Sequence, residues 1–193
     1  PDAADFNEDI SRWDVASATT MRRMFAFAMS FDQPLGNWDV SSVMDIAGMF
    51  AGADVFDQPI GDWNVSSVTD MRFLFADSSS FNRPIGNWDV SSVMDMSLMF
   101  YGATSFDQPL GNWDVSSVTT MAFMFSSATS FDQPIGNWDV SSVTTMVAMF
   151  NEAFSFNQTL ADWNVQSNTD IRSIFDNSGC PFSEDLSRQS CGF

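Results

Sequence analysis

Carboxylates recur at one fixed place in this chain, directly after a tryptophan. The column, with one member every twenty-five residues, contains Asp14, Asp39, Asn64, Asp89, Asp114, Asp139 and Asn164. Carboxylate and amide oxygens are the ligands that Ca²⁺ prefers, and paired carboxylates can hydrolyse glycosides. The candidate binding ladder consists of Asp39, Asn64, Asp89, Asp114 and Asp139. Its candidate metal ligands are Asp89, Asp114 and Asp139.

Two interpretations of this acidic ladder stay open. In the first, the ladder binds Ca²⁺ or a mineral surface through its oxygens. In the second, Asp and Asn are short polar residues that hydrogen bond to the neighbouring backbone. Like charges on adjacent strands are unfavourable, so we expect their repulsion to raise the pKa of some of these carboxyls.

No group of residues has the features of a catalytic site. The sequence singles out no carboxylate pair, and it contains neither histidine nor lysine. The Ser41-Ser42 pair returns in the interior repeats, which indicates a structural role. We therefore predict that the protein is not an enzyme and that it needs no cofactor, Ca²⁺ being the one candidate.

Two cysteines, Cys180 and Cys191, lie near the C-terminus. Two cysteines without histidine are too few for a metal site. We predict a disulfide that holds a C-terminal cap and that forms in an oxidising, extracellular setting. The alternative is a pair of free thiols in a reducing cell.

A repeat of twenty-five residues must position all of these side chains. Three aromatic columns keep this step without an insertion: Trp13 to Trp163, Phe6 to Phe156 and Phe25 to Phe175. Such periodicity is the signature of a repeat protein. Two methionine columns have the spacing of core residues, and Ile46 and Ile171 replace methionine within them, so we assign these columns to the core and not to a metal site.

Each repeat divides into two patterns. The first has the spacing of a leucine-rich repeat on a strand, with Trp38 and Val40 pointing inward, and runs over residues 35 to 43. The second has the apolar spacing of a short helix and runs over residues 46 to 53. We therefore predict an α/β solenoid with one parallel strand and one short helix in each repeat, its strands about 4.8 Å apart.

The unit FDQPIGNWDVSSVTTMVAMF (131 to 150) resembles the repeats of BspA-like leucine-rich-repeat surface proteins, and more narrowly those of the DUF285 type. The resemblance extends from residue 6 to about residue 178. It implies a right-handed solenoid, a surface or secreted location and, for some relatives, adhesion to host or matrix proteins. It implies no catalytic residues.

The seventh repeat departs from the consensus, as terminal repeats commonly do. Asn168 stands where the other repeats have valine, and Gln166 stands where they have serine. We expect one domain, in which a solenoid of seven repeats (1–178) is followed by a disulfide-linked C-terminal cap (179–193).

Charge excludes some partners. The chain has 25 acidic and 7 basic residues, a net charge of −18. A nucleic-acid-binding protein would need lysine and arginine to neutralise phosphates, so we exclude nucleic acid. No stretch is apolar for long enough to cross a bilayer, so we expect no direct insertion into a membrane.

Three exposed candidates share one register on adjacent repeats: Phe73, Leu98 and Phe123. They form either an apolar stripe for a partner or a lateral contact between neighbouring helices. From these features we expect a non-enzymatic binding module at the cell surface or outside the cell, with a protein or glycan ligand in adhesion. The alternative is an acidic scaffold for Ca²⁺ or mineral.

Overall fold

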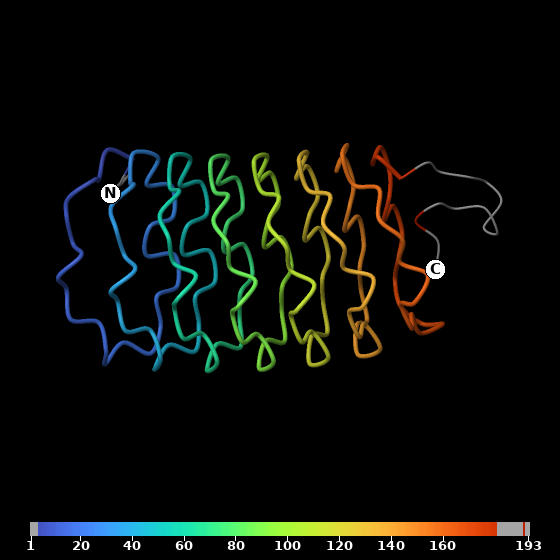
Figure 1. Ribbon diagram of the computed structural model, residues 1–193, viewed down its shortest axis with the longest axis horizontal. Coiled ribbons are helices and arrows are strands. Elements are labelled where there is room, and N and C mark those ends of the chain that lie inside the picture. The colour runs from blue at the N-terminus through green and yellow to red at the C-terminus, as the bar shows by residue number, and fades with distance from the viewer. Residues whose placement is uncertain (1–3, 181–190, 192–193) are drawn as a thin grey trace.

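The computed structural model describes residues 4–180 and 191 of the 193-residue chain. The chain winds into coils that lie side by side along one long axis, with the two ends of the chain at opposite ends of the stack (Figure 1). Six isolated parallel bridges join seven successive coils at equivalent residues. They connect Thr20, Asp45, Asp70, Asp95, Thr120, Thr145 and Asp170 in order.

Regular secondary structure is almost absent from the described residues. They contain no helix and no continuous strand, and the only sheet-like pairing is the six single bridges. In that part of the chain no helix could cross a membrane. The predicted right-handed, leucine-rich-repeat-like α/β solenoid, with one parallel strand and one short helix per repeat, is therefore wrong.

The segment predicted to be a helix forms consecutive tight turns, as residues 71–78 illustrate. The backbone N–H of Leu74 donates to the carbonyl oxygen of Met71, three residues earlier, at 3.2 Å. The N–H of Phe73 instead leaves the coil and donates to the carbonyl oxygen of Ser97 at 3.0 Å. A helix would bond every N–H within its own segment, whereas here alternate N–H groups join neighbouring coils. We call residues 46–53 and their equivalents the turn face.

Backbone dihedrals show why these turns are not helical. Two residues per coil, four positions apart, have positive φ, as at Gly48 (63°) and Gly52 (68°). Glycine adopts this conformation without strain, and a right-handed helix does not contain it. The apolar residues of the segment have the spacing of one helix face. A series of tight turns with the same spacing also directs these side chains into the core. The paired glycines were the local signal for turns.

The segment predicted to be a strand, residues 35–43 and their equivalents, is named here the Trp face. Trp38 and Val40 are both buried, as predicted. Among the described residues, however, no backbone-to-backbone hydrogen bond joins neighbouring coils on this face. The indole N–H makes the connection, and the Nε1 of Trp113 donates to the carbonyl oxygen of Ile85 at 3.1 Å. The backbone hydrogen bonds between coils that were predicted for the Trp face lie on the turn face instead.

Two stacked columns of phenylalanine fill the space between the faces. The ring centroids of Phe100 and Phe125, on neighbouring coils, are 5.4 Å apart, and those of Phe100 and Phe106, within one coil, are 4.1 Å apart. All three rings are fully buried. Each contributes roughly 1.5–3 kcal/mol by leaving water. The methionines of the two predicted columns are also buried except Met24, which is 37% exposed, so their assignment to the core is confirmed for the other members.

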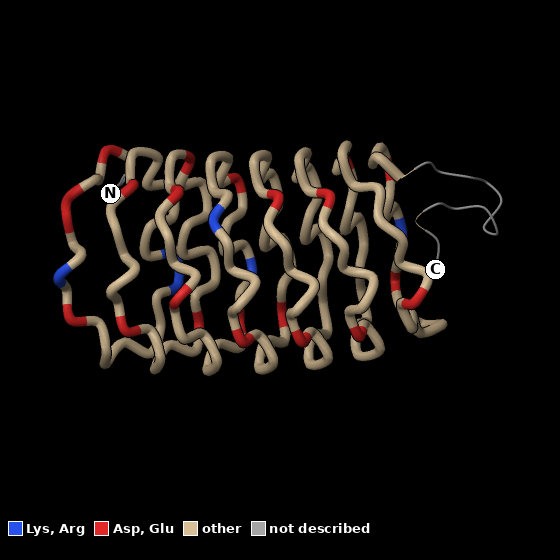
Figure 2. The backbone as a smooth tube through the Cα atoms, in the orientation of Figure 1, with Lys and Arg blue, Asp and Glu red and all other residues tan. Residues whose placement is uncertain are grey.

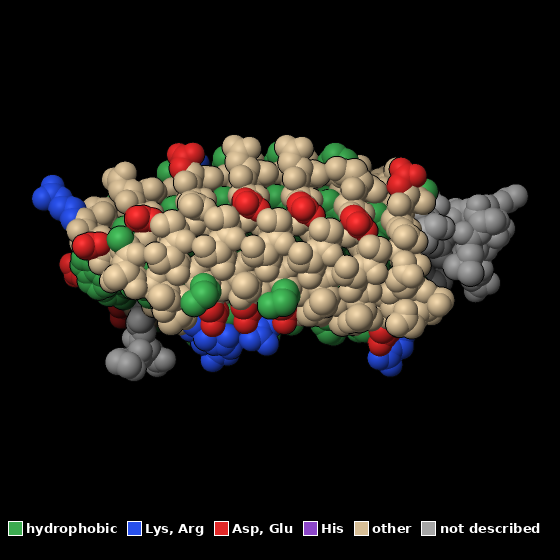
Figure 3. All heavy atoms as spheres, turned by 90° about the horizontal axis from the view of Figure 1, so that it is seen from below, with side chains coloured by type: hydrophobic (Ala, Val, Ile, Leu, Met, Phe, Trp, Pro, Cys, Tyr) green, Lys and Arg blue, Asp and Glu red, His purple; other side chains and the backbone are tan. Residues whose placement is uncertain are grey.

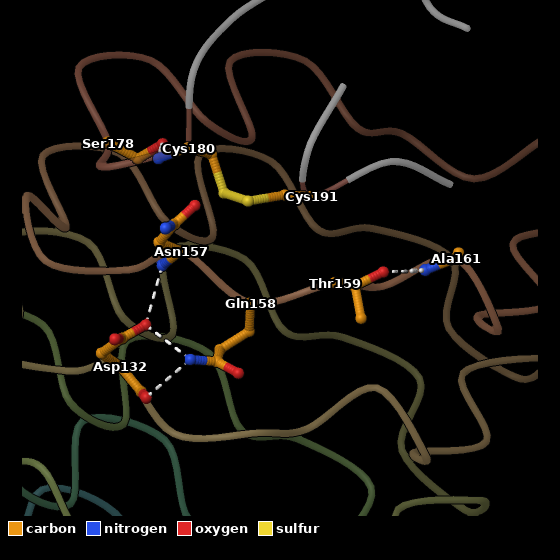
Figure 4. Close-up of a disulfide and its surroundings, with 8 residues drawn as sticks. All are labelled: Asp132, Asn157, Gln158, Thr159, Ala161, Ser178, Cys180 and Cys191. Atoms are coloured by element: carbon orange, nitrogen blue, oxygen red, sulfur yellow. Dashed lines mark hydrogen bonds between the residues drawn. A yellow bond between two sulfur atoms is a disulfide. The ribbon is translucent and has the colours of Figure 1, made fainter. Parts of the chain in front are cut away.

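A disulfide joins Cys180 to Cys191, with their Cα atoms 5.9 Å apart, as predicted (Figure 4). Leu160 of the last coil donates its backbone N–H to the carbonyl oxygen of Cys191 at 3.3 Å. The rest of the predicted cap, residues 181–190 and 192–193, lies outside the described residues.

Candidate functional site

The carboxylates of the acidic ladder bind their own coil. The Oδ1 atom of Asp89 accepts hydrogen bonds from the backbone N–H of Ser91 at 3.1 Å and from its Oγ at 2.6 Å. Asn64 accepts the same pair from Ser66 at 3.2 and 2.7 Å. This is an Asx turn, which short polar side chains form with the backbone two residues on. The same turn occurs at Asp39, Asp114 and Asp139.

The serine donors lower the pKa of the ladder carboxyls at Asp39, Asp89 and Asp139. The hydroxyl of the serine two residues later has the largest effect, and its backbone N–H has the next largest. The prediction that repulsion would raise these values is wrong for the three residues, because water screens their charges and two donors stabilise each anion. Figure 3 shows acidic side chains set in a row along one face of the stack.

The calcium hypothesis stays a prediction. Among the described residues no three side chains of Asp, Glu, Cys or His are grouped so as to hold a metal ion. The proposed ligands Asp89, Asp114 and Asp139 each direct an oxygen to a serine of their own coil. The second interpretation, in which short polar residues bond to the neighbouring backbone, accounts for all the ladder contacts that we observe.

A second column of acidic residues and amides links the coils directly. This column was not predicted from the sequence. The Oδ1 of Asp132 accepts the backbone N–H of Asn157 and the Nε2 of Gln158, both at 2.8 Å (Figure 4). Asp107 accepts from the equivalent groups one coil earlier. The recurring D-Q-P and N-Q sequence was the available signal. These acidic residues therefore have a structural role. Figure 2 shows acidic residues recurring on successive coils.

Arginine neutralises part of a third acidic column, at the bridge positions. Arg72 forms ion pairs with Asp70 at 2.7 Å and with Asp95 at 3.5 Å. Arg22 lies between Asp45 and Asp70, at 3.5 and 3.6 Å. Hydrogen bonding to Asp70 raises the pKa of Arg72. Figure 3 shows arginine and acidic side chains gathered along one edge of the molecule.

The apolar stripe of Phe73, Leu98 and Phe123 lies on the turn face. Phe73 is 40% exposed, Phe123 is 37% exposed and Leu98 is half-buried. All three have positive φ, between 56° and 58°. The alternative assignment, a contact between neighbouring helices, is wrong because the turn face contains no helix. The structure thus presents the three side chains in equivalent positions on consecutive coils.

A groove of about 430 Å³ crosses several coils at the start of the Trp face. Proline, glycine and Asn or Asp line it in three columns, each with one residue per coil. The lining residues are Pro59, Gly61, Asp62, Pro84, Gly86, Asn87, Pro109, Gly111, Asn112 and Pro134. No member of the acidic ladder or of the apolar stripe lines this groove.

Comparison with known families gives one match. The model of a family described as "Mycoplasma protein of unknown function, DUF285" matches residues 1–86 and 69–188. No curated protein and no solved structure matches the chain. The DUF285 part of the predicted resemblance is confirmed, while the narrower BspA-like assignment receives no support from this match.

Proposed function

The chain belongs to the DUF285 family, and since that family is described as being of unknown function, we infer a function from the geometry: a non-enzymatic module that binds a protein partner through the turn face. The apolar stripe carries this proposal. A bulky residue at positive φ is strained by about 1–3 kcal/mol. Phe73 and Phe123 accept that strain while remaining more than a third exposed.

The fold itself does not require aromatic side chains in this register. Gly48 occupies the same position two repeats before Leu98 and has the same positive φ. Backbone hydrogen bonds to the next coil hold the stripe in place. The N–H of Phe123 donates to the carbonyl oxygen of Val147 at 2.9 Å, and that of Leu98 donates to the carbonyl oxygen of Ala122 at 2.9 Å. A rigid apolar surface of this kind matches the anchors found at protein interfaces.

The proposed setting is outside the cell or at its surface, and the proposed role is adhesion. The Cys180–Cys191 disulfide supports this, because disulfides persist in oxidising compartments. The resemblance of the repeats to BspA-like surface proteins supports it as well, and we keep that narrower assignment as part of the proposal.

The test replaces both aromatic members of the stripe, Phe73→Ser with Phe123→Ser. The matched control is Phe154→Ser, which removes a phenylalanine that is 60% exposed in a different register. Binding is measured on a sensor surface that carries purified collagen, laminin or fibronectin. Fluorescence of the dye ANS, which binds exposed apolar surface, gives a second readout that needs no partner.

We expect the double variant to lose about tenfold or more in affinity for a bound matrix protein. It should also lose ANS fluorescence while its thermal midpoint stays unchanged. The control should keep both signals. Equal losses in the control, or wild-type binding by the double variant, would show that the stripe is not the contact surface.

A further inference from the structure

The apolar stripe runs along the stack at a short and regular step. Backbone hydrogen bonds join the coils in its own register, as where the N–H of Phe73 donates to the carbonyl oxygen of Ser97 at 3.0 Å. Parallel-bridged backbones of this kind lie about 4.8 Å apart. Two residues further along each coil, the ring centroid of Phe100 lies 5.7 Å from that of Phe75 and 5.4 Å from that of Phe125. Equivalent side chains near the turn face therefore advance by about 5 Å with each coil.

An α-helix repeats its side chains at the same step. Side chains three or four residues apart on a helix lie about 5–6 Å from each other, and a helix that packs on an apolar surface uses anchors at i, i+3 or i+4, and i+7. Side chains on one face of an extended chain are about 6.6–6.8 Å apart, so such a chain would be about 2 Å out of step at the third coil. A helix parallel to the stack axis can therefore reach Phe73, Leu98 and Phe123 in turn.

The charges beside the stripe favour a basic partner. On one flank, Arg72 pairs with Asp70 and Asp95. On the other flank lie Asp77 and Glu152, which are exposed and follow the register of the stripe by four residues. In the described part of the chain neither of these two carboxylates forms an ion pair, and the whole chain has a net charge of −18. Lysine or arginine on a partner would be attracted to this flank.

We propose that the apolar stripe binds a basic amphipathic helix of the protein partner, lying along the stack axis. This inference rests on the proposed function, because it uses the same three side chains, and it adds the secondary structure and the charge of the bound segment. The apolar face of the helix packs on the stripe, and its lysine or arginine residues lie over Asp77 and Glu152. Arg23 stands in the same register two coils before Phe73, outside the three coils of the stripe.

Three peptides of equal length are the probes. The first has leucine at i, i+3, i+4 and i+7 and lysine elsewhere, and the second has glutamate in place of the lysine. The third has leucine and lysine in strict alternation, the pattern of a strand. Fluorescence anisotropy of the labelled peptides measures binding. Because the described residues contain no helix, a gain in helical circular dichroism on mixing reports on the peptide.

Two variants separate the stripe from its charged flank. The stripe variant is Phe73→Ser with Phe123→Ser, and the charge variant is Asp77→Asn with Glu152→Gln. The matched control, Asp62→Asn with Asp162→Asn, removes two exposed carboxylates from the Trp face. It therefore changes the net charge by the same amount on a different face.

We expect the helical lysine peptide to bind about tenfold more tightly than either of the other peptides and to gain helical signal. The charge variant should lose about threefold in affinity and depend less on salt, and the stripe variant should lose about tenfold. The Trp-face control should bind as the unaltered protein does.

Equal binding of the alternating peptide, or binding without a gain in helical signal, would overturn the helix. Equal affinities of the charge variant and its Trp-face control would overturn the basic character of the partner. The absence of binding by the helical lysine peptide would overturn the whole inference. Each of these results leaves the proposed function to its own test, the loss of matrix-protein binding in the stripe variant.

Discussion

The turn face and the Trp face of each coil are both joined to the neighbouring coil by hydrogen bonds, but the two faces use different atoms. On the turn face, backbone meets backbone, as in the donation from Phe75 to the carbonyl oxygen of Met99 at 2.9 Å. On the Trp face, a side chain reaches across, as in the donation from the indole of Trp138 to Leu110 at 3.1 Å. Both devices satisfy polar groups that would otherwise be buried without a partner.

The difference shows where the sequence is constrained and where it is free. The Trp face needs a particular side chain in every coil, and tryptophan recurs there seven times. The turn face is joined by main-chain atoms, so its outward positions vary among Arg23, Gly48, Phe73 and Ser173 in one register. The outward side chains of the turn face can therefore be changed without loss of the backbone hydrogen bonds between coils.

The largest expected effect comes from removing one side-chain link of the Trp face. Trp113→Ala deletes a buried indole and its bond to Ile85, which should destabilise the protein by about 3–5 kcal/mol. The control, Trp13→Ala, removes a tryptophan of the same register that is 54% exposed. Chemical denaturation followed by fluorescence measures both variants. Similar midpoints for the two would mean that the indole links are not what joins the coils on this face.

Substitutions should distinguish a glycine that is needed because there is no space for a Cβ atom from one that is needed because its φ is positive. Gly86→Ala on the Trp face should cost about 1–3 kcal/mol, because its Cβ meets a backbone oxygen at 2.5 Å. Gly48→Ala on the turn face should cost about 1–2 kcal/mol, because of its positive φ.

The asparagine variants give the control. Gly48→Asn should be less harmful than Gly48→Ala, since asparagine tolerates the left-handed region. Gly86→Asn should bring no such relief, because its Cβ meets the same oxygen. Thermal midpoints compare the four variants. A rescue by asparagine at both positions would contradict the distinction.

A smaller effect is expected from the ion pairs at the bridge positions. Arg72→Gln removes contacts with Asp70 and Asp95, and exposed pairs of this kind contribute about 0.2–1 kcal/mol. The loss should disappear in concentrated salt. Arg172→Gln is the control, because its side chain is 82% exposed and, among the described residues, it pairs with Asp170 alone. A salt-independent loss at Arg72 would show that packing, and not charge, is responsible.

The smallest effect on stability is expected from titration, and its sign differs between the faces. Burial, with a contribution from the charge of Asp54, raises the pKa of Asp77 on the turn face, whereas the serine donors lower that of Asp89 on the Trp face. As pH falls, Asp77 should therefore be protonated first, which removes a partly desolvated charge and slightly stabilises the fold. Stability should then decline as pH falls below the ordinary aspartate range and through the lowered pKa of Asp89.

Carboxyl NMR measures this order directly. Ser91→Ala should move the pKa of Asp89 upward and leave that of Asp77 unchanged. If Asp89 were protonated before Asp77 in the unaltered protein, the assignment of these shifts to the two environments would be wrong.

Part of the fold and the candidate site could be predicted from the sequence. The inward direction of Trp38 and Val40, the assignment of the interior methionines to the core and the Cys180–Cys191 disulfide are confirmed. The helix was wrong because Ile46, Met49 and Phe50 have an apolar spacing that fits both a helix face and a series of turns. The groove was missed because the prolines, glycines and amides that line it come from several consecutive coils.

The sequence by itself determined the twenty-five-residue period, which residues enter the core and which two cysteines pair. These properties follow from residue type and spacing along the chain. Only the tertiary structure decided that the segment after Val43 forms turns and that backbone hydrogen bonds join the turn faces of neighbouring coils. It also decided that the pKa values of Asp39, Asp89 and Asp139 in the acidic ladder are lowered. The reason is that a turn-face N–H, such as that of Phe73, can donate either to a carbonyl oxygen in its own coil or to one twenty-four residues later in the next coil. That choice is settled only when the coils stack.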